Sequence, residues 1–160
     1  SDGKSTEAYE MIAEAIVSDP VNPRLPLAMC KLLKHEERFS EALKLIDTLP
    51  DQIRKSQEID QLHDLLSFHL DADPSNDMNA TITHVEACPD DVEARQQLVA
   101  WYVIQQKFKE ALNELVNIMD IDHSFDDSYA QKAMLKIFNI LGTEHSLVAE
   151  FRPNLKRYTH

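Results

Sequence analysis

The residues whose types and spacing could hold a metal ion lie in two stretches where an oxygen-bearing side chain recurs at every second position. These are Asp71, Asp73, Ser75 and Asp77, and Asp120, Asp122, Ser124 and Asp126. The alternation is that of the first ligands in a calcium-binding loop between two helices, which also needs Gly at its sixth position and Glu at its twelfth. Here the sixth positions are Asn76 and Phe125, and the twelfth are Ile82 and Gln131. We therefore interpret both stretches as capped turns between helices and expect no metal site.

The Cys and His residues do not form a ligand set either. Cys30 and Cys88 are 58 positions apart (88 minus 30) and belong to no CxxC pair, so we interpret both as structural thiols. His63 and His69 are six apart, which does not place them on one face of a helix. The stretch HEERF, residues 35–39, has Phe where a zinc-binding HExxH helix has its second His. We expect the histidines to lie on the surface.

Nucleophilic catalysis and phosphate binding are also unsupported by the sequence. A nucleophile held on a sharp turn, or a loop that cradles phosphate, needs a Gly-rich segment. The chain has only Gly3 and Gly142. We expect no enzyme and no cofactor.

Composition and charge narrow the classes of partner. Of the 160 residues 43% are apolar, which suffices for a core, and the formal net charge is −12. An acidic surface repels phosphate backbones, so we expect no nucleic-acid partner. No apolar run approaches the ~18 residues that would predict a membrane-spanning helix, so no membrane partner is expected. Residues 144–160 differ, with three Lys or Arg against two Glu.

The pattern of apolar residues predicts helices throughout. Two Gly against seven Pro suits a chain of helices with Pro at their edges, because Gly costs about 1 kcal/mol inside a helix. The expected helices cover residues 4–17, 23 onward, 38–49, 57–70, 76–87, 91–105, 107–119, 126–141 and 143 onward. For the eighth, Ser124 and Asp127 have the spacing of a capping box, and Gly142 suits a left-handed C-terminal cap. The class is therefore all-α, with about nine helices.

The sequence of one expected helix occurs twice in nearly the same form. FSEALKLI, residues 39–46, returns as FKEALNEL, residues 108–115, and 69 positions separate Ala42 from Ala111 (111 minus 42). This is about twice 34, the period of the tetratricopeptide repeat, a helix pair with Ala where its helices cross. The sequence therefore predicts a tetratricopeptide-like antiparallel helix-pair solenoid.

Framed on Ala111, one repeat begins at residue 92, and its consensus positions are apolar or small. They are Leu98, Val99, Tyr102 and Phe108. The earlier copy has Met29, Cys30, Leu33, Phe39 and Ala42 at the corresponding positions. Its second helix is expected to be short because Pro50 comes early. Residues 58–91 keep the repeat length but not the consensus, and we interpret them as a decayed repeat.

Some tetratricopeptide domains clamp a C-terminal carboxylate with Lys, Arg and Asn on the first helix of each repeat. The comparable positions here hold Leu27 and Lys31 in one repeat and Gln96 and Ala100 in the other. Only Lys31 is cationic, so we expect no carboxylate clamp.

The C-terminal third carries a more specific resemblance. Residues 133–155, AMLKIFNILGTEHSLVAEFRPNL, resemble the end of the bacterial thioredoxin-like proteins of the chaperedoxin (YbbN-type) family, and residues 87–112 resemble the segment before it. The resemblance implies an N-terminal thioredoxin domain ahead of a single tetratricopeptide-like domain over residues 1–160. An odd number of helices indicates either a lone capping helix or a missing partner helix, and the resemblance favours the second. It also implies a cytoplasmic, chaperone-linked protein.

Two functions remain open. In the first, the chain is a non-catalytic interaction module that binds unfolding clients and hands them to chaperonin or Hsp70 machinery, as the resemblance implies. In the second, it is a structural spacer that positions the thioredoxin domain and binds no partner itself.

The candidate partner-binding residues lie at the end of the chain, where apolar and cationic side chains alternate. They are Phe151, Arg152, Leu155, Lys156, Arg157 and Tyr158. In one interpretation, a helical stripe that includes Phe151 and Leu155 packs on the helix over residues 126–141 and seals the solenoid. In the other, Pro153 breaks the last helix, and the residues after it stand partly free to meet an acidic partner.

Overall fold

The structure is a computed structural model, and it describes residues 7, 10, 11, 14, 18 and 24–157. Over these residues all regular structure is helical, and no strand is present. The chain divides into two compact units, Ser1–Ser67 and Phe68–His160, and the division falls inside one helix. The expected helix over residues 4–17 lies largely outside the described part. A single domain over residues 1–160 stays a prediction.

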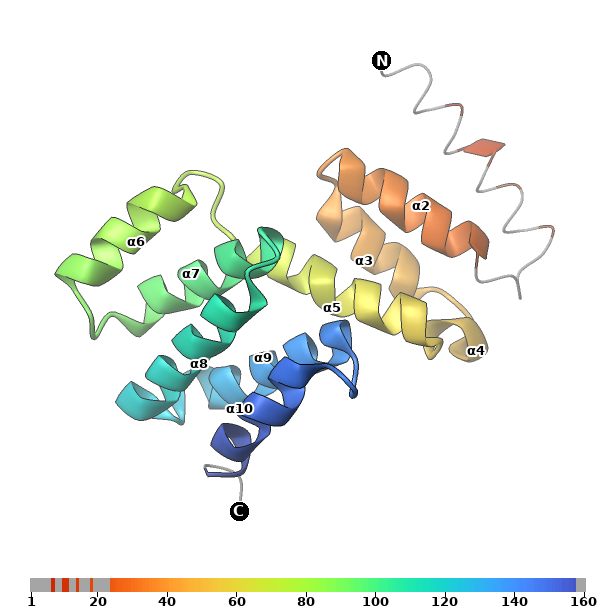
Figure 1. The fold of residues 1–160 in the computed structure, drawn as a ribbon. Helices are drawn as coiled ribbons and strands as arrows, with labels where there is room; N and C mark the ends of the chain where they lie inside the picture. The colour runs from red at the N-terminus through yellow and green to blue at the C-terminus, as the bar shows by residue number, and fades with distance from the viewer. Residues whose placement is uncertain (1–6, 8–9, 12–13, 15–17, 19–23, 158–160) are drawn as a thin grey trace. The chain divides into compact units, whose positions relative to one another are not determined.

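Nine helices are labelled along the described chain (Figure 1). They are α2 (Arg24–His35), α3 (Phe39–Asp47), α4 (Asp51–Arg54), α5 (Gln57–Asp71), α6 (Met78–Ala87), α7 (Val92–Ile104), α8 (Phe108–Asp122), α9 (Phe125–Leu141) and α10 (Ser146–Lys156). Eight of these fall on predicted helices, with ends shifted by up to three residues. The ninth, α4, was not predicted.

In the first unit, α2 and α3 pack where their small residues meet. Cys30 and Ala42 are both fully buried, and the Cys30 thiol donates to the Ala42 carbonyl oxygen at 3.8 Å. This confirms the crossing predicted from the repeat frame. A core of larger apolar residues surrounds the crossing and includes Leu33, Ile46, Ile59, Leu62 and Leu66.

The second helix of this repeat is short, as Pro50 predicted. α3 ends at Asp47, where the N–H of Thr48 donates to the Leu45 carbonyl oxygen and the N–H of Leu49 donates to that of Ile46, both at 3.1 Å. Pro50 then takes an extended conformation and becomes the N-cap of α4, whose Ile53 returns to the core at 3% exposure. Propensity alone does not reveal α4, because four residues form a helix only where packing holds them.

The second unit contains the clearer repeat, formed by α7 and α8. Leu98, Val99 and Ala111, which the frame placed at the helix contact, are exposed by 2%, 0% and 0%. α6 packs on α7, and α9 packs on α8. The last helix, α10, packs on both α9 and α8. Residues 58–91, predicted to be one decayed repeat, instead contain the division between the two units.

Both acidic stretches form turns, as predicted. The backbone N–H of Ser75 donates to Asp73 Oδ1 at 2.9 Å, and that of Ser124 donates to Asp122 Oδ1 at 3.1 Å. Asp77 is the N-cap of α6 and accepts a hydrogen bond from the Ala80 N–H at 2.7 Å. Carboxylates at these positions satisfy backbone donors that the helix itself leaves open.

The capping box predicted at the start of α9 is wrong. The Ser124 hydroxyl donates to Asp122 Oδ1 at 2.8 Å and makes no cap hydrogen bond. Asp126, Asp127 and Ser128 have φ between 47° and 62°, so the chain turns left-handed before the regular part of α9 begins. The prediction of Gly142 as the end of α9 is confirmed, since it has φ 96° and its N–H donates to the Phe138 carbonyl oxygen at 2.9 Å.

The second interpretation of the chain end, in which Pro153 breaks the last helix, is wrong. α10 runs through Pro153 to Lys156, and the Arg157 N–H donates to the Pro153 carbonyl oxygen at 3.2 Å. Proline removes one backbone donor. Here Phe151 and Val148, at 5% and 1% exposure, hold the helix in place by packing. The stripe therefore packs on its neighbours, as the first interpretation expected.

Replacing Ala111 with Leu tests the helix contact. Ala111 has no exposed surface, so three added carbon atoms must push α8 away from its neighbour, and we expect a loss of about 1 to 3 kcal/mol in the free energy of unfolding. Urea denaturation followed by circular dichroism measures this loss. Ala149→Leu on the exposed side of α10 is the matched control. Equal stability of the two variants would contradict the contact.

Candidate functional site

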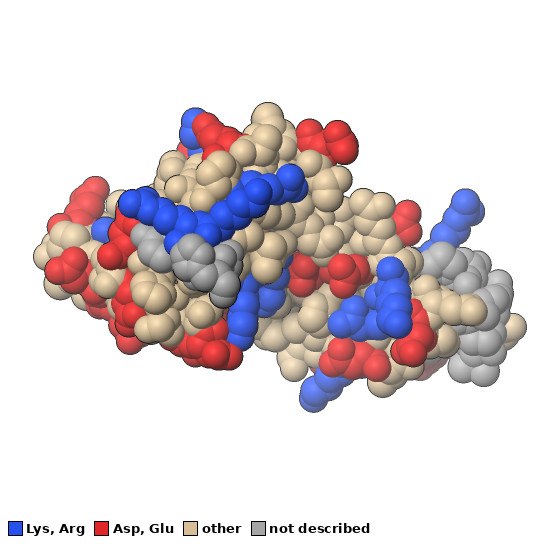
Figure 2. Space-filling model, turned by 90° about the horizontal axis from the view of Figure 1, so that it is seen from below, with Lys and Arg blue, Asp and Glu red and all other residues tan. Residues whose placement is uncertain are grey.

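The last helix divides its residues between a packed face and a cationic face. Val148 and Phe151 are buried, and Leu147 and Leu155 are half-buried. Arg152, Lys156 and Arg157 are exposed. Figure 2 shows Lys and Arg side chains gathered over this part of the second unit, with acidic side chains around them. We call the exposed side chains of Arg152, Lys156 and Arg157 the α10 cations.

The predicted partner-binding residues thus separate into three groups. Phe151, at 5% exposure, belongs to the core, and Leu155 lies at its edge. The α10 cations face solvent. Tyr158 lies outside the described residues. Nearby, Lys109 Nζ on α8 lies 4.0 Å from Glu150 Oε1, and both side chains are more than half exposed. Such an exposed pair adds little stability.

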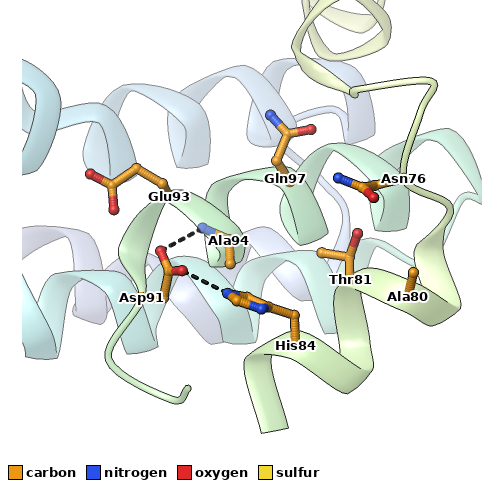
Figure 3. A pocket seen from close by; sticks show the side chains of 8 residues that line it. All are labelled: Asn76, Ala80, Thr81, His84, Asp91, Glu93, Ala94 and Gln97. Atoms are coloured by element: carbon orange, nitrogen blue, oxygen red, sulfur yellow. Dashed lines mark hydrogen bonds and ion pairs between the residues drawn. The ribbon is translucent and has the colours of Figure 1, made fainter. Parts of the chain in front are cut away.

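A groove between α6 and α7 is the second candidate site (Figure 3). Its volume is about 440 Å³. The lining residues are Asn76, Ala80, Thr81 and His84 from the α6 side and Asp91, Glu93, Ala94 and Gln97 from the α7 side. Ala80, Thr81 and Ala94 are small, so the two helices leave room between them even though they pack together. We call this hollow the α6–α7 groove.

Hydrogen bonds fix both ends of the groove. At one end, His84 Nε2 lies 2.7 Å from Asp91 Oδ2, while Asp91 Oδ1 caps α7 by accepting from the Ala94 N–H at 3.1 Å (Figure 3). At the other end, Gln97 Nε2 donates to the Asp71 carbonyl oxygen and Gln97 Oε1 accepts from the Asp73 N–H, both at 2.7 Å. The groove is therefore held open by polar contacts at its two ends.

The charge of the groove is negative. The contact with His84, followed by the Ala94 N–H, lowers the pKa of Asp91, so this carboxyl is ionised at neutral pH. Glu93 is exposed, and its side chain lies near enough to Asp91 to lower that pKa further. The sequence showed the acids but not the groove, because neither His84 nor Gln97 has a spacing that marks a partner.

One cation near the groove is held in place by other contacts. Arg95 Nη1 lies 2.6 Å from Glu114 Oε2 on α8, and Arg95 Nε donates to the Pro89 carbonyl oxygen at 2.7 Å. The Arg95 and Glu114 side chains are only 13% and 15% exposed. Arg95 therefore ties α7 to α8 and to the preceding turn, and does not neutralise the groove.

A buried polar cluster in the second unit lacks the pairing that catalysis would need. The Tyr129 hydroxyl is buried without a hydrogen-bond partner, and burial raises its pKa. Burial also raises the pKa of Asp71, and Lys136 acts against that rise. Lys136 Nζ in turn lies 5.8 Å from the centre of the Phe68 ring, within cation–π range. None of these groups is paired as nucleophile and base.

The two thiols differ. Cys30 is buried, and burial raises its pKa to about 11. Cys88 is exposed at the C-cap of α6, where its backbone N–H donates to the His84 carbonyl oxygen at 2.8 Å and its carbonyl oxygen accepts from the Asp91 N–H at 3.1 Å. The burial of Cys30 fits the structural interpretation, and for the exposed Cys88 that interpretation stays a prediction.

The positions compared with a carboxylate clamp differ in their exposure. In the second unit Ala100 is completely buried and Gln96 is half-buried, and in the first unit Lys31 is exposed. Over the described residues, no group of three His, Cys, Asp or Glu side chains is arranged to hold a metal ion. No helix in that part of the chain is long and apolar enough to cross a membrane.

Stacked helix pairs with small residues at their crossings define a helical-repeat protein, a class whose members generally bind other proteins. Models of the tetratricopeptide repeat match residues 1–66 and 71–160, and the second match alone covers more than half of the chain. The chain belongs to the tetratricopeptide repeat family. The predicted fold class is thereby confirmed, and domains of this family are typically non-catalytic interaction modules.

Comparisons with individual proteins and solved structures are less informative than the family match. No curated protein matches the chain. One solved structure, a domain of protein VP0806 of unknown function from Vibrio parahaemolyticus RIMD 2210633, is 21% identical, with 99% of this chain and 92% of that chain covered. Its TM-score is 0.47, and a likeness at this level has no bearing on function.

Asp91 is expected to support stability through its cap and through its charge. Asp91→Ala removes both, and we expect a loss of about 1 kcal/mol, whereas Asp91→Asn keeps the cap and should lose less. Urea denaturation at pH 7 compares the two variants. Equal losses would contradict the capping role.

The pH dependence of stability distinguishes the charge of Asp91 from its role as an N-cap. Because the folded-state pKa of Asp91 is lowered, its charge stabilises the fold above the unfolded-state pKa of about 3.9, and this stability is lost as the pH falls through the folded-state value. Asp91→Asn should therefore show a shallower fall in stability below about pH 4 than the unmodified chain.

The thiols give a chemical test of the first unit. In native protein at pH 8, one thiol per chain, that of Cys88, should react quickly with Ellman's reagent, because Cys30 is buried and its pKa of about 11 leaves almost no thiolate. Unfolding in guanidinium should release the second. Cys88→Ser should abolish the fast reaction, and a fast reaction in this variant would contradict the burial of Cys30.

Proposed function

We propose that this chain is the interaction module of a thioredoxin-like, chaperone-linked protein, and that the α10 cations contact an acidic surface of its partner. The expected partners are unfolding clients and the chaperonin or Hsp70 machinery of a bacterial cytoplasm. The thioredoxin domain belongs to the same proposal and would precede this chain.

The exposure of the α10 cations is the observation that carries this proposal. The chain has a net charge of −12, yet Arg152, Lys156 and Arg157 project together from its last helix. Val148 and Phe151 fix that helix in the core, so the cations are presented from a rigid element. Charged groups arranged in this way mainly set the choice of partner and the rate of association.

The membership of the tetratricopeptide repeat family supports protein partners in general. The chaperone link is supported by the resemblance of residues 87–112 and 133–155 to the chaperedoxin family. A structural spacer is the competing function, and it requires no exposed cationic surface. The two functions predict different results for a surface substitution that leaves the fold unchanged.

The double substitution Arg152→Glu with Lys156→Glu reverses the surface charge and leaves Phe151 in place. We expect an unchanged melting temperature and a loss of about tenfold or more in affinity for purified chaperonin, measured by pull-down and by biolayer interferometry. The unmodified chain at a few-fold molar excess should also reduce the light scattering of a heat-denatured client.

Lys44→Glu with Lys55→Glu is the matched control, because it makes the same change of net charge on exposed residues of the first unit. The control should retain chaperonin binding. An equal loss of chaperonin affinity in both double variants would show that the effect comes from the net charge of the chain and not from the α10 cations. If the unmodified chain neither binds chaperonin nor lowers the light scattering, the spacer function replaces this proposal.

A further inference from the structure

The α6–α7 groove takes no part in the proposed function, and its chemistry differs from that of the α10 cations. It combines a hollow of about 440 Å³, small residues between two helices and negative charge at its rim. We propose that the α6–α7 groove binds a basic peptide segment of a partner protein, with a Lys or Arg side chain placed against Asp91 and Glu93.

The shape of the groove suits a long side chain with a charged end. Ala80, Thr81 and Ala94 offer methyl groups between the helices, and the aliphatic stem of Lys or Arg can lie against such a surface. Asp91 and Glu93 lie at one end, where the charged head would meet them (Figure 3). The volume is more than one side chain fills, so the groove accommodates neighbouring residues of a peptide.

Charge complementarity determines the kind of occupant. The groove lies in residues 68–98, which contain the acids Asp71, Asp73, Asp77, Glu86, Asp90, Asp91 and Glu93 and the single cation Arg95. Seven negative charges against one positive charge give −6, half of the net charge of the chain. Arg95 is tied to Glu114 and Pro89, so this cation does not balance the acids of the groove.

The rim also has a local reason to attract a cation. Asp91 and Glu93 lie close together, so one bound group can reach both side chains. His84 contacts only the Oδ2 atom of Asp91. A guanidinium or ammonium group between the two side chains could form charge-assisted hydrogen bonds with both.

The polar contacts at both ends preorganise the groove to bind an extended segment. Gln97 holds the turn that contains Asp71 and Asp73, and Asp91 holds the turn after α6. The groove walls therefore need no rearrangement to admit a ligand, which reduces the entropic cost of binding. Asn76 and Gln97 add amide groups that can bond the backbone of a peptide.

Binding to two labelled octapeptides tests the proposal. One alternates Arg and Ala, the other alternates Glu and Ala, and fluorescence anisotropy with the whole chain measures both. We expect the basic peptide to bind and to weaken as salt rises from 50 to 300 mM, and the acidic peptide not to bind. Amide chemical-shift changes should concentrate in α6, α7 and the turn between them. No binding of the basic peptide, or shifts centred elsewhere, would overturn the proposal.

Three variants separate the groove from the net charge. Glu93→Gln removes one rim charge and should raise the dissociation constant about threefold. Ala94→Leu fills the hollow without changing any charge and should raise the dissociation constant about tenfold. Glu144→Gln, on an exposed residue outside the groove, is the control and should leave the affinity unchanged. Circular dichroism confirms that each variant is folded.

The outcomes are distinct. Equal weakening by Glu93→Gln and Glu144→Gln would overturn the proposal in favour of general electrostatic attraction, and so would full affinity in folded Ala94→Leu. Self-association of the chain, abolished by Ala94→Leu in sedimentation velocity, would make a second copy the occupant and would also overturn it. Reversal of the α10 cations should leave peptide binding intact, so failure here is distinguishable from failure of the proposed function.

Discussion

The close approach of neighbouring helices at small side chains is the constraint on which the rest of this structure depends. Cys30 meets Ala42 in one unit, and Val99 and Ala111 are completely buried in the other. Helices that approach so closely bring their larger residues into the same core, and burial of that apolar surface supplies most of the stability. The outward faces are then free to carry charge.

This constraint also explains why much of the fold is predictable from the sequence. Ala42 and Ala111, 69 residues apart, reveal the repeat, and the apolar spacing around each of them reveals the helices. The structure departs from prediction where the signal is not periodic. α4 consists of four residues held by Ile53, and the three left-handed residues before Tyr129 have no preference that reveals them in advance.

The candidate sites were predictable to different degrees. Arg152, Lys156 and Arg157 stand out in the sequence because an acidic chain becomes locally basic, and the structure places all three on the surface. Which residue of the stripe is buried depends on α8 and α9, so Phe151 could not be assigned from α10 alone. The α6–α7 groove arises from small residues on two helices and from the contacts of Gln97, none of which has a sequence signature.

The packing of the helices has a consequence for how the chain folds. The closely packed pairs are α2 with α3, α6 with α7, α7 with α8, α8 with α9, α9 with α10, and α8 with α10, so each joins helices that are adjacent or one apart in sequence. Contacts this local need only short loops to close, and chains built from them have low contact order. Ordering can begin at one helix pair, such as α7 with α8, and spread to its neighbours. Each unit should therefore fold quickly for its length, without waiting for distant segments to meet.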